Sequence, residues 1–139
     1  MIDTPVGRMQ IFCLHLTLSY PARIQREFDL ALGMRDASVP AIVCGDFNIL
    51  ESPHITILNW LLGGSLREAL GWRDSRKAFQ QRFVRLGLQN PLRGAHTQQI
   101  ALSQLDHILV PAASQVVEKR SFTDRRGSDH TPIFVEIAG

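Results

Sequence analysis

The stretch Ala41-Ile42-Val43-Cys44-Gly45-Asp46-Phe47-Asn48 joins an apolar run to a carboxylate and an amide that are two residues apart. Four apolar residues in a row predict a buried strand, and the polar residues that follow predict that its end is exposed. Polar side chains at the carboxyl end of a buried strand are a common site of chemistry in layered α/β domains. We therefore expect Asp46 and Asn48 to belong to a functional site.

The residues before this stretch predict a second buried strand, with a helix between the two. Residues 9–18 are rich in Ile, Phe, Cys and Leu, and His15 lies near the end of this run. Pro21 suits the first turn of a helix, and apolar residues then recur at helical spacing to about Met34. Strand, helix and the strand at 41–46 follow the rhythm of layered proteins, so the predicted class is α/β or α+β.

The rest of the chain predicts more helix, then a long irregular segment, then three strands. Glu51-Ser52-Pro53 resembles a capped helix start whose apolar pattern continues to Gly63-Gly64, and a further short turn of helix is expected from Leu66 to Trp72. Residues 73–103 are polar and basic without clear periodicity, so we expect a functional loop there. The predicted strands cover residues 104–110, 115–122 and 132–138.

The composition is typical of one soluble globular domain. The 139 residues are 45% hydrophobic and 20% charged. No apolar run approaches the roughly 20 residues of a membrane helix, and the N-terminus lacks a signal-peptide pattern, so we expect a cytoplasmic protein. Cys13 and Cys44 lie in apolar strand-like runs, which predicts two buried free thiols rather than a disulfide or a zinc site.

The residues after the first stretch suit the hydrolysis of a phosphate ester. That reaction needs a positioned water, neutralised charge on the phosphoryl oxygens and stabilisation of the leaving oxygen. Asp46 can orient or deprotonate water, and Asn48 can hold the water or a phosphate oxygen. Asp46 and Asn48 point to the same side of an extended chain, which favours a shared role.

Two acidic–histidine pairs, Asp106-His107 and Asp129-His130, occur in later strand-like segments. His130 can donate a hydrogen bond to a phosphate, and does so best if a carboxylate fixes its tautomer and favours its charged form. We expect Asp106 to be that carboxylate. Asp129 is then available for a hard divalent cation such as Mg²⁺. We expect His107 to be structural.

Gly45-Asp46-Phe47-Asn48, Leu105-Asp106-His107-Ile108 and Ser128-Asp129-His130-Thr131-Pro132-Ile133 occur in this order, after a strand with His15-Leu16. Together they resemble the endonuclease/exonuclease/phosphatase superfamily, whose fold is shared by DNase I, exonuclease III-type abasic endonucleases, sphingomyelinases and inositol polyphosphate 5-phosphatases. The resemblance runs from about residue 9 to 137. Each motif alone is weak, whereas three in the correct order at strand ends are strong evidence.

The resemblance implies a metal-dependent phosphoesterase that uses Mg²⁺ or Mn²⁺. Water would attack a phosphodiester or phosphomonoester in line, without a covalent enzyme intermediate. Asp46 would position and activate this water, and Asn48 would orient it. Asp106 would pair with His130, which would stabilise the pentacovalent transition state.

Two further roles and a class of substrate come with the resemblance. Asp129 would contribute to the metal site, and His15 would contact the scissile phosphate, as in the DNase I-like and sphingomyelinase-like branches. The substrate would be a phosphate ester in a nucleic acid, a phospholipid head group or an inositol phosphate. The motifs do not determine this choice, because loops make it, and we expect the determinant within residues 73–103.

The resemblance also implies a fold for residues 1–139. They would form a single partial domain, the C-terminal half of a four-layer α-β-β-α sandwich, with one mostly antiparallel mixed sheet and helices on one face. Family members carry an early Asn and a metal-anchoring Glu in an N-terminal half, and the only acid before His15 here is Asp3. One sheet alone exposes a large apolar face, so we expect a missing N-terminal half or a partner chain to cover it.

Other interpretations follow from the same residues. Taken singly, Asp46 and Asp129 are explained by turns and Asp106 by a surface position on a strand. A half-fold without the anchoring Glu could be a non-catalytic remnant or an interaction module. The basic segment 73–93 could instead make the chain a nucleic-acid-binding domain, in which binding weakens steeply with salt. The local cluster Arg120, Arg125 and Arg126 could also contact phosphate.

Overall fold

The computed structural model describes residues 1–5, 7–18, 21–49, 61, 66–99 and 101–138. The helix predicted at 51–62 lies outside these ranges, apart from residue 61. The elements found in them are β1 (Ile2–Thr4), β2 (Gly7–His15), α1 (Pro21–Leu32), β3 (Ala41–Asp46), α3 (Leu66–Arg85), β4 (Leu88–Gln89), β5 (Asp106–Pro111), β6 (Val116–Ser121) and β7 (Ile133–Ile137). None of the helices in these ranges has the length and apolar character needed to cross a membrane.

Five of the strands form a mixed sheet in the order β1-β2-β3-β5-β4. Strands β2 and β3 are parallel neighbours, and the other three neighbouring pairs are antiparallel. Helix α1 connects β2 to β3, as a crossover between parallel strands requires. The predicted α+β class and mostly antiparallel mixed sheet are therefore confirmed.

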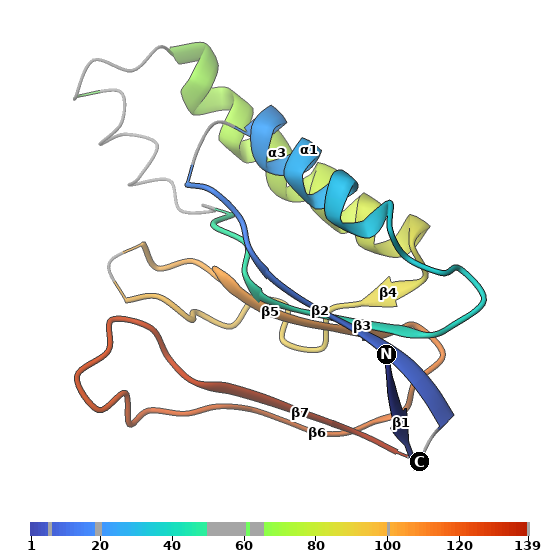
Figure 1. Ribbon diagram of the computed structural model, residues 1–139. Coiled ribbons are helices and arrows are strands. Elements are labelled where there is room, and N and C mark those ends of the chain that lie inside the picture. The colour runs from blue at the N-terminus through green and yellow to red at the C-terminus, as the bar shows by residue number, and fades with distance from the viewer. Residues whose placement is uncertain (6, 19–20, 50–60, 62–65, 100, 139) are drawn as a thin grey trace.

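The described elements lie in three layers (Figure 1). Helices α1 and α3 cover one face of the five-stranded sheet, and β6 and β7 form a two-stranded sheet on the other face. Strand β7 packs against β5. The helices on one face of the five-stranded sheet were expected, whereas the separate two-stranded sheet of β6 and β7 was not.

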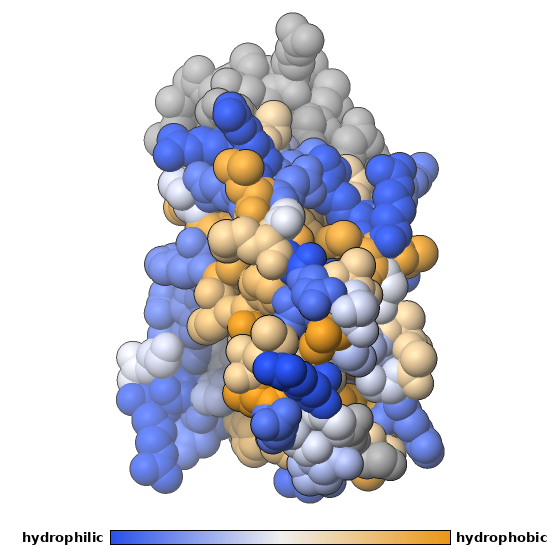
Figure 2. Space-filling view, turned by 45° about the vertical axis from the view of Figure 1, so that its right-hand side comes forward, coloured by the Kyte–Doolittle hydropathy of each residue, from blue (hydrophilic) through white to orange (hydrophobic). Residues whose placement is uncertain are grey.

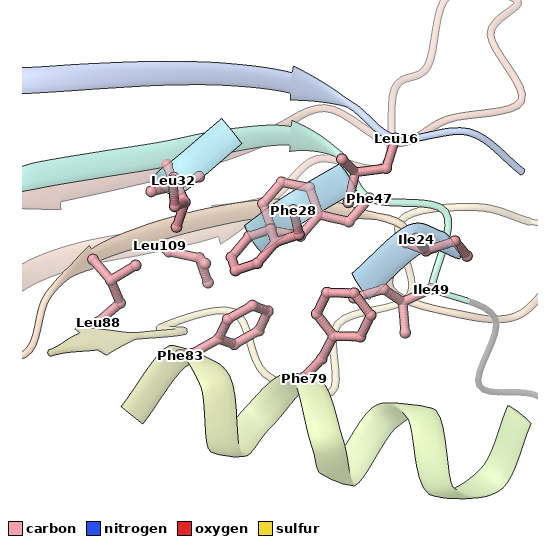
Figure 3. Close-up of a cluster of buried hydrophobic side chains, with 11 residues drawn as sticks. Leu16, Ile24, Phe28, Leu32, Phe47, Ile49, Phe79, Phe83, Leu88 and Leu109 are labelled. Atoms are coloured by element: carbon pink, nitrogen blue, oxygen red, sulfur yellow. The ribbon is translucent and has the colours of Figure 1, made fainter. Parts of the chain in front are cut away.

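The core lies between the two helices and the five-stranded sheet (Figure 3). Ile24, Phe28 and Leu32 are spaced by four residues on α1, so they share one face and are buried. Phe79 and Phe83 on α3 meet the ring of Phe28, with centroids 5.6 and 5.7 Å away. The remaining cluster members come from strands and loops: Leu16, Val43, Phe47, Ile49, Leu88 and Leu109.

The prediction of an irregular loop over 73–103 is wrong for its first part, because helix α3 continues to Arg85. No Gly or Pro lies between residues 73 and 85, so nothing in the local sequence ends the helix. Phe79 and Phe83 are both 1% exposed, whereas Val84 beside them is 74% exposed. Among the described side chains of α3, Phe79 and Phe83 are the large apolar residues that face the core, and two such residues are too few to show a helical period in the sequence.

The prediction that both cysteines are buried is also wrong. Cys13 is exposed and Cys44 is partly buried, and burial is the main reason why the pKa of the Cys44 thiol is raised. Cys13 and Cys44 are register partners on β2 and β3, on the sheet face that points away from the helices. Ile11 on the same face is 47% exposed, so β6 and β7 leave this part of the sheet uncovered. Apolar side chains gather in a band on the molecular surface (Figure 2).

Candidate active site

Strand register brings three of the predicted site residues into one row. His15 ends β2, Asp46 ends β3 and Asp106 begins β5. His15 is the register partner of Asp46, which in turn is the partner of Asp106. Partners directly across a sheet lie on the same face, and here it is the face opposite the helices. The three side chains therefore meet at one edge of the sheet, although 91 residues separate the first from the last (106 − 15).

His130 joins this row from the segment that leads into β7. Its Nδ1–H donates a hydrogen bond of 2.7 Å to Oδ2 of Asp106, so the pairing expected between them is present. Burial alone would lower the pKa of His130, but the bond to Asp106 and the charges of Asp106, Asp46 and Asp129 together raise it above its usual value. The arrangement thus favours a cationic imidazole beside Asp46.

The same residues form a cluster of potential ligands for a metal ion. One ligand atom from each of Asp46, Asp106 and His130 lies within 4.8 Å of the others. Asp129, predicted to hold the metal, is exposed and lies outside this group. Its Oδ2 accepts a hydrogen bond of 3.4 Å from Nε2 of Gln98. The sequence did not predict that Asp46 and Asp106 share a potential ligand cluster.

Gly45 and Phe47 explain why the partly buried carboxylate of Asp46 points away from the core. Gly45 has φ 126°, and a Cβ atom added there would lie 1.9 Å from the carbonyl oxygen of Leu14 on β2. Only glycine fits this close approach of the two strands. Phe47 is fully buried and packs against Phe28 and His107. Because Phe47 faces the core, Asp46 on the alternate side faces away from it.

Asn48 is buried and clamps the ends of β2 and β3 together. Its backbone has φ 51°, a left-handed conformation that asparagine adopts more readily than most residues. The amide Nδ2 donates to the carbonyl of Leu16 at 2.7 Å, and the backbone N–H donates to Oδ1 of Asp46 at 2.9 Å. Asn48 therefore fixes the orientation of the Asp46 carboxylate. Its predicted contact with water stays a prediction.

His15, which belongs to the row, and His107, which follows Asp106, differ in exposure. The side chain of His15 is 81% exposed, and its Nε2 lies 3.9 Å from Oδ2 of Asp46. It can therefore reach a group bound next to Asp46. His107 is buried, and burial is the main reason why its pKa falls to about 4. Its Nδ1–H donates to the carbonyl of Leu105 at 2.9 Å, in line with the structural role expected for it.

Sequence reasoning missed the contribution of the turn at residues 97–99. Gln98 makes isolated β-bridges to both Ser103 and His130, which places this turn against the histidine. The side-chain oxygen of Gln99 accepts a hydrogen bond from Arg125. A turn of this kind has no periodic pattern, so no sequence signal marks it.

The three arginines that could contact phosphate, Arg120, Arg125 and Arg126, each have a partner within the protein. Arg120 pairs with Glu118, and Arg126 lies 3.3 Å from Asp124. Arg125 is bonded to Gln99. Two arginines and two aspartates help to line an open hollow of 480 Å³ that reaches the residue before His130: Arg125, Arg126, Asp124 and Asp129. Its acidic and basic side chains balance, so it is not a strongly cationic site.

Comparison with solved structures finds the same fold in several proteins, including the following three. An endonuclease/exonuclease/phosphatase from Beutenbergia cavernae DSM 12333 matches 98% of this chain with a TM-score of 0.69 and 17% identity. An AP endonuclease from Archaeoglobus fulgidus matches 93% with a TM-score of 0.62 and 17% identity. A functionally unknown conserved protein from Enterococcus faecalis V583 matches 93% with a TM-score of 0.53 and 21% identity. The matches cover only 37%, 61% and 49% of those proteins.

Comparison with sequences gives the family. Among curated protein sequences there is no significant match. The model of the Endonuclease/Exonuclease/phosphatase family matches residues 10–130, which include the row of site residues from His15 to His130. The chain therefore belongs to the endonuclease/exonuclease/phosphatase family.

Proposed function

We propose that the chain carries the site of a metal-dependent phosphoesterase, which hydrolyses a phosphodiester or phosphomonoester by in-line attack of water. The observation that carries this proposal is the 2.7 Å bond between Asp106 and His130, with the carboxylate of Asp46 beside it. The cationic imidazole can donate to a negatively charged phosphoryl oxygen, and the carboxylate next to it can activate water. This pair suits a reaction in which water attacks the phosphorus atom of a phosphate ester and displaces the alcohol.

Each residue of the row has a role in this proposal. Asp46 orients the attacking water and accepts its proton, and Asn48 holds Asp46 through the bond from its backbone N–H. His130 donates a hydrogen bond to a phosphoryl oxygen, and Asp106 keeps it in the tautomer and orientation for this task. His15, which is exposed, contacts the scissile phosphate. The further contact of the Asn48 amide with the water is part of the same proposal.

The donor set fits a hard divalent cation. Asp46 and Asp106 supply carboxylate oxygens, the ligands that Mg²⁺ and Mn²⁺ prefer, and Asp129 is close enough for its charge to act on His130. The bond from His130 occupies only one of the two oxygens of Asp106. Such an ion, when bound, neutralises charge on the phosphoryl oxygens. We propose Asp46, Asp106 and Asp129 as the residues that hold it.

A second polypeptide segment is part of the proposal. The sheet face that carries the site is uncovered around Ile11 and Cys13. The chain spans about two fifths to three fifths of the similar solved structures (37%, 49% and 61%). We propose that a further segment or a partner chain covers this face and supplies the remaining metal ligand. The substrate is a phosphate ester, in a nucleic acid, a phospholipid head group or an inositol phosphate.

The proposal is tested by hydrolysis assays with and without Mg²⁺ or Mn²⁺. The substrates are bis-p-nitrophenyl phosphate, a duplex with an abasic site, because one similar structure is an AP endonuclease, and sphingomyelin. We expect turnover that EDTA abolishes and added metal restores. Asp46→Asn and His130→Gln should each lower kcat by about 100-fold or more. Asp3→Asn, an exposed carboxylate on β1, is the control and should retain full turnover.

Metal binding is measured separately, since turnover depends on every step. Millimolar Mg²⁺ or Mn²⁺ should raise the Tm of the wild-type chain and not that of Asp46→Asn. Turnover that survives both substitutions would eliminate the site. A Tm that no metal shifts, together with no turnover, would favour the non-catalytic remnant instead.

The nucleic-acid-binding alternative receives no support from the segment on which it depends. Residues 73–85 belong to helix α3, whose Phe79 and Phe83 are buried in the core. Arg82 pairs with Asp29 on α1 at 3.1 Å. A helix that serves as a packed layer of the fold is explained without a polyanion.

A further inference from the structure

Thr97 has a position that the proposed roles do not explain. It is fully buried, and its Oγ1 accepts two backbone hydrogen bonds, from the N–H groups of Leu105 and Asp106, both at 2.9 Å. The Leu105 amide lies directly before strand β5, and the Asp106 amide is the first of the strand, at the point where Asp106 contacts His130. A buried N–H group without an acceptor is destabilising, so a hydroxyl that serves two of them is a strong constraint on the backbone there.

The backbone of Thr97 makes the matching contact on the other side of the catalytic pair. Its carbonyl oxygen accepts a hydrogen bond of 2.7 Å from the N–H of Thr131, the residue after His130. Gln98, the next residue, is bridged to His130 itself. One residue thus holds the backbone of Asp106 with its side chain and the backbone next to His130 with its carbonyl.

The same contacts reach the first motif. The carbonyl of Leu105 accepts a hydrogen bond of 2.8 Å from the N–H of Phe47, the residue after Asp46. Leu105 is therefore held between Thr97 and Phe47. Thr97 is therefore connected, directly or through Leu105, to the segments that carry Asp46, Asp106 and His130.

We infer that Thr97 is a positioning residue that sets the distance between Asp106 and His130, and so the orientation of the imidazole. This inference rests on the proposed function for its effect on rate, but not for its effect on geometry. A displacement of the pair by about 1 Å is enough to lower a rate by roughly 100-fold, because the reacting groups must be aligned in the transition state. Thr97 itself touches no reacting atom.

The test compares three variants at this position and one control. Thr97→Val keeps the shape but removes the acceptor, and we expect kcat to fall by about 10- to 100-fold with KM within about twofold. Thr97→Ser restores the hydroxyl and should recover kcat to within about threefold. Thr97→Cys keeps only a weak acceptor and gives an intermediate kcat, which serves if Thr97→Val does not fold. Thr4→Val is the control, because it makes the same change at a threonine of β1 far from the site, whose Oγ1 donates to the Gly7 carbonyl.

A measurement without turnover separates this inference from the proposed function. The proton of the His130 Nδ1–H···Asp106 bond should give a low-field ¹H NMR resonance in the wild type and in Thr97→Ser, assigned by its loss in His130→Gln. Thr97→Val should lose or shift it, and the control Thr4→Val should keep it. A wild type with the resonance and no turnover would contradict the proposed function alone. Unchanged resonance and kcat in folded Thr97→Val or Thr97→Cys would overturn the role of Thr97.

Discussion

The rings of Phe47 and His107 are stacked, with centroids 4.7 Å apart and 5° between their planes. Phe47 directly follows Asp46, and His107 directly follows Asp106. Their contact therefore joins β3 and β5 on the core side of the sheet, beneath the candidate site. Both side chains are buried, and His107 is neutral at pH 7 because its pKa is about 4. An imidazole here is a packing residue whose titration is coupled to folding.

Stability should therefore fall in mildly acidic solution. The unfolded chain takes up a proton on His107 near pH 6.5, whereas the folded chain takes it up only near pH 4. The free energy of unfolding is thus unaffected by this group above about pH 6.5 and decreases as the pH falls toward 4, by about 3 kcal/mol. Urea unfolding at pH 7 and pH 4.5 should show this loss in the wild type and a smaller one in His107→Phe. Equal losses in both proteins would contradict the coupling.

Replacing Asp106 by Asn should change His130 without removing its hydrogen-bond acceptor. The bond to the Asp106 carboxylate and its charge raise the pKa of His130, so Asp106→Asn should lower that pKa. In the proposed reaction, kcat should fall by about 100-fold or more, because the imidazole loses its preferred tautomer and charge. NMR titration of the His130 ring protons measures the first effect and steady-state kinetics the second. An unshifted titration would mean that the pair does not interact in solution.

Gly45→Ala should destabilise the chain far more than the same change at another glycine. The new Cβ would collide with the Leu14 carbonyl, and backbone atoms of a neighbouring strand cannot move away cheaply. We expect a loss of at least about 3 kcal/mol, or no folding. Gly94 also has a positive φ, of 87°, but nothing within 4 Å of an added Cβ, so Gly94→Ala should cost only about 1 kcal/mol. Denaturant midpoints of the two variants should differ accordingly, and similar midpoints would contradict the close approach.

Truncation of two neighbouring residues of α3 should destabilise the chain to very different extents. Phe83 is 1% exposed and contacts four aromatic rings, whereas Val84 is 74% exposed. Phe83→Ala should cost about 3–5 kcal/mol, and Val84→Ala less than about 0.5 kcal/mol. Thermal unfolding of both variants checks this difference. Comparable Tm values would mean that α3 does not pack on the sheet as described.

The uncovered sheet face should bind an apolar probe. Ile11 lies on this face and is 47% exposed, so a fluorescent dye that reports apolar surface should bind the isolated chain. Ile11→Lys should weaken dye binding and change stability by less than about 0.5 kcal/mol. Met34→Lys, at an exposed residue beyond the end of α1, is the control and should leave the signal unchanged. Dye binding that ignores Ile11→Lys would show that the surface lies elsewhere.

The elements that the sequence predicted best are those with a strong local pattern. The unbroken apolar run at 41–44 predicted β3, and apolar residues that recur at helical spacing from Ile24 predicted α1, because each element buries a continuous run or stripe. A short turn of helix was expected from Leu66 to Trp72, but the continuation of α3 to Arg85 was missed, because only Phe79 and Phe83 among its described side chains anchor it in the core. The exposure of Cys13 was missed because an apolar strand does not reveal which of its faces is covered.

The site shows the same division. The pairing of Asp106 with His130 was expected because a donor imidazole needs a carboxylate to fix its tautomer, and because the resemblance to the family implies the same pair. The contribution of Asp46 and Asp106 to one ligand cluster depends on strand register, which no motif states. Thr97 and Gln98 act through hydrogen bonds between irregular segments, and such bonds leave no trace in composition or period.

Side chains along β3 and β5 point alternately toward the helix layer and toward the candidate site, so the two faces of these strands are constrained differently. Val43, His107 and Leu109 point into the helix layer, while Asp46 and Asp106 point away from it. Substitutions that repack the helices can therefore accumulate without disturbing the carboxylates of the candidate site, and new loops can change what reaches these carboxylates without loosening the interior. A chain built in this way can diverge until little of its sequence is shared and still present the same arrangement of acids and imidazole to a new substrate.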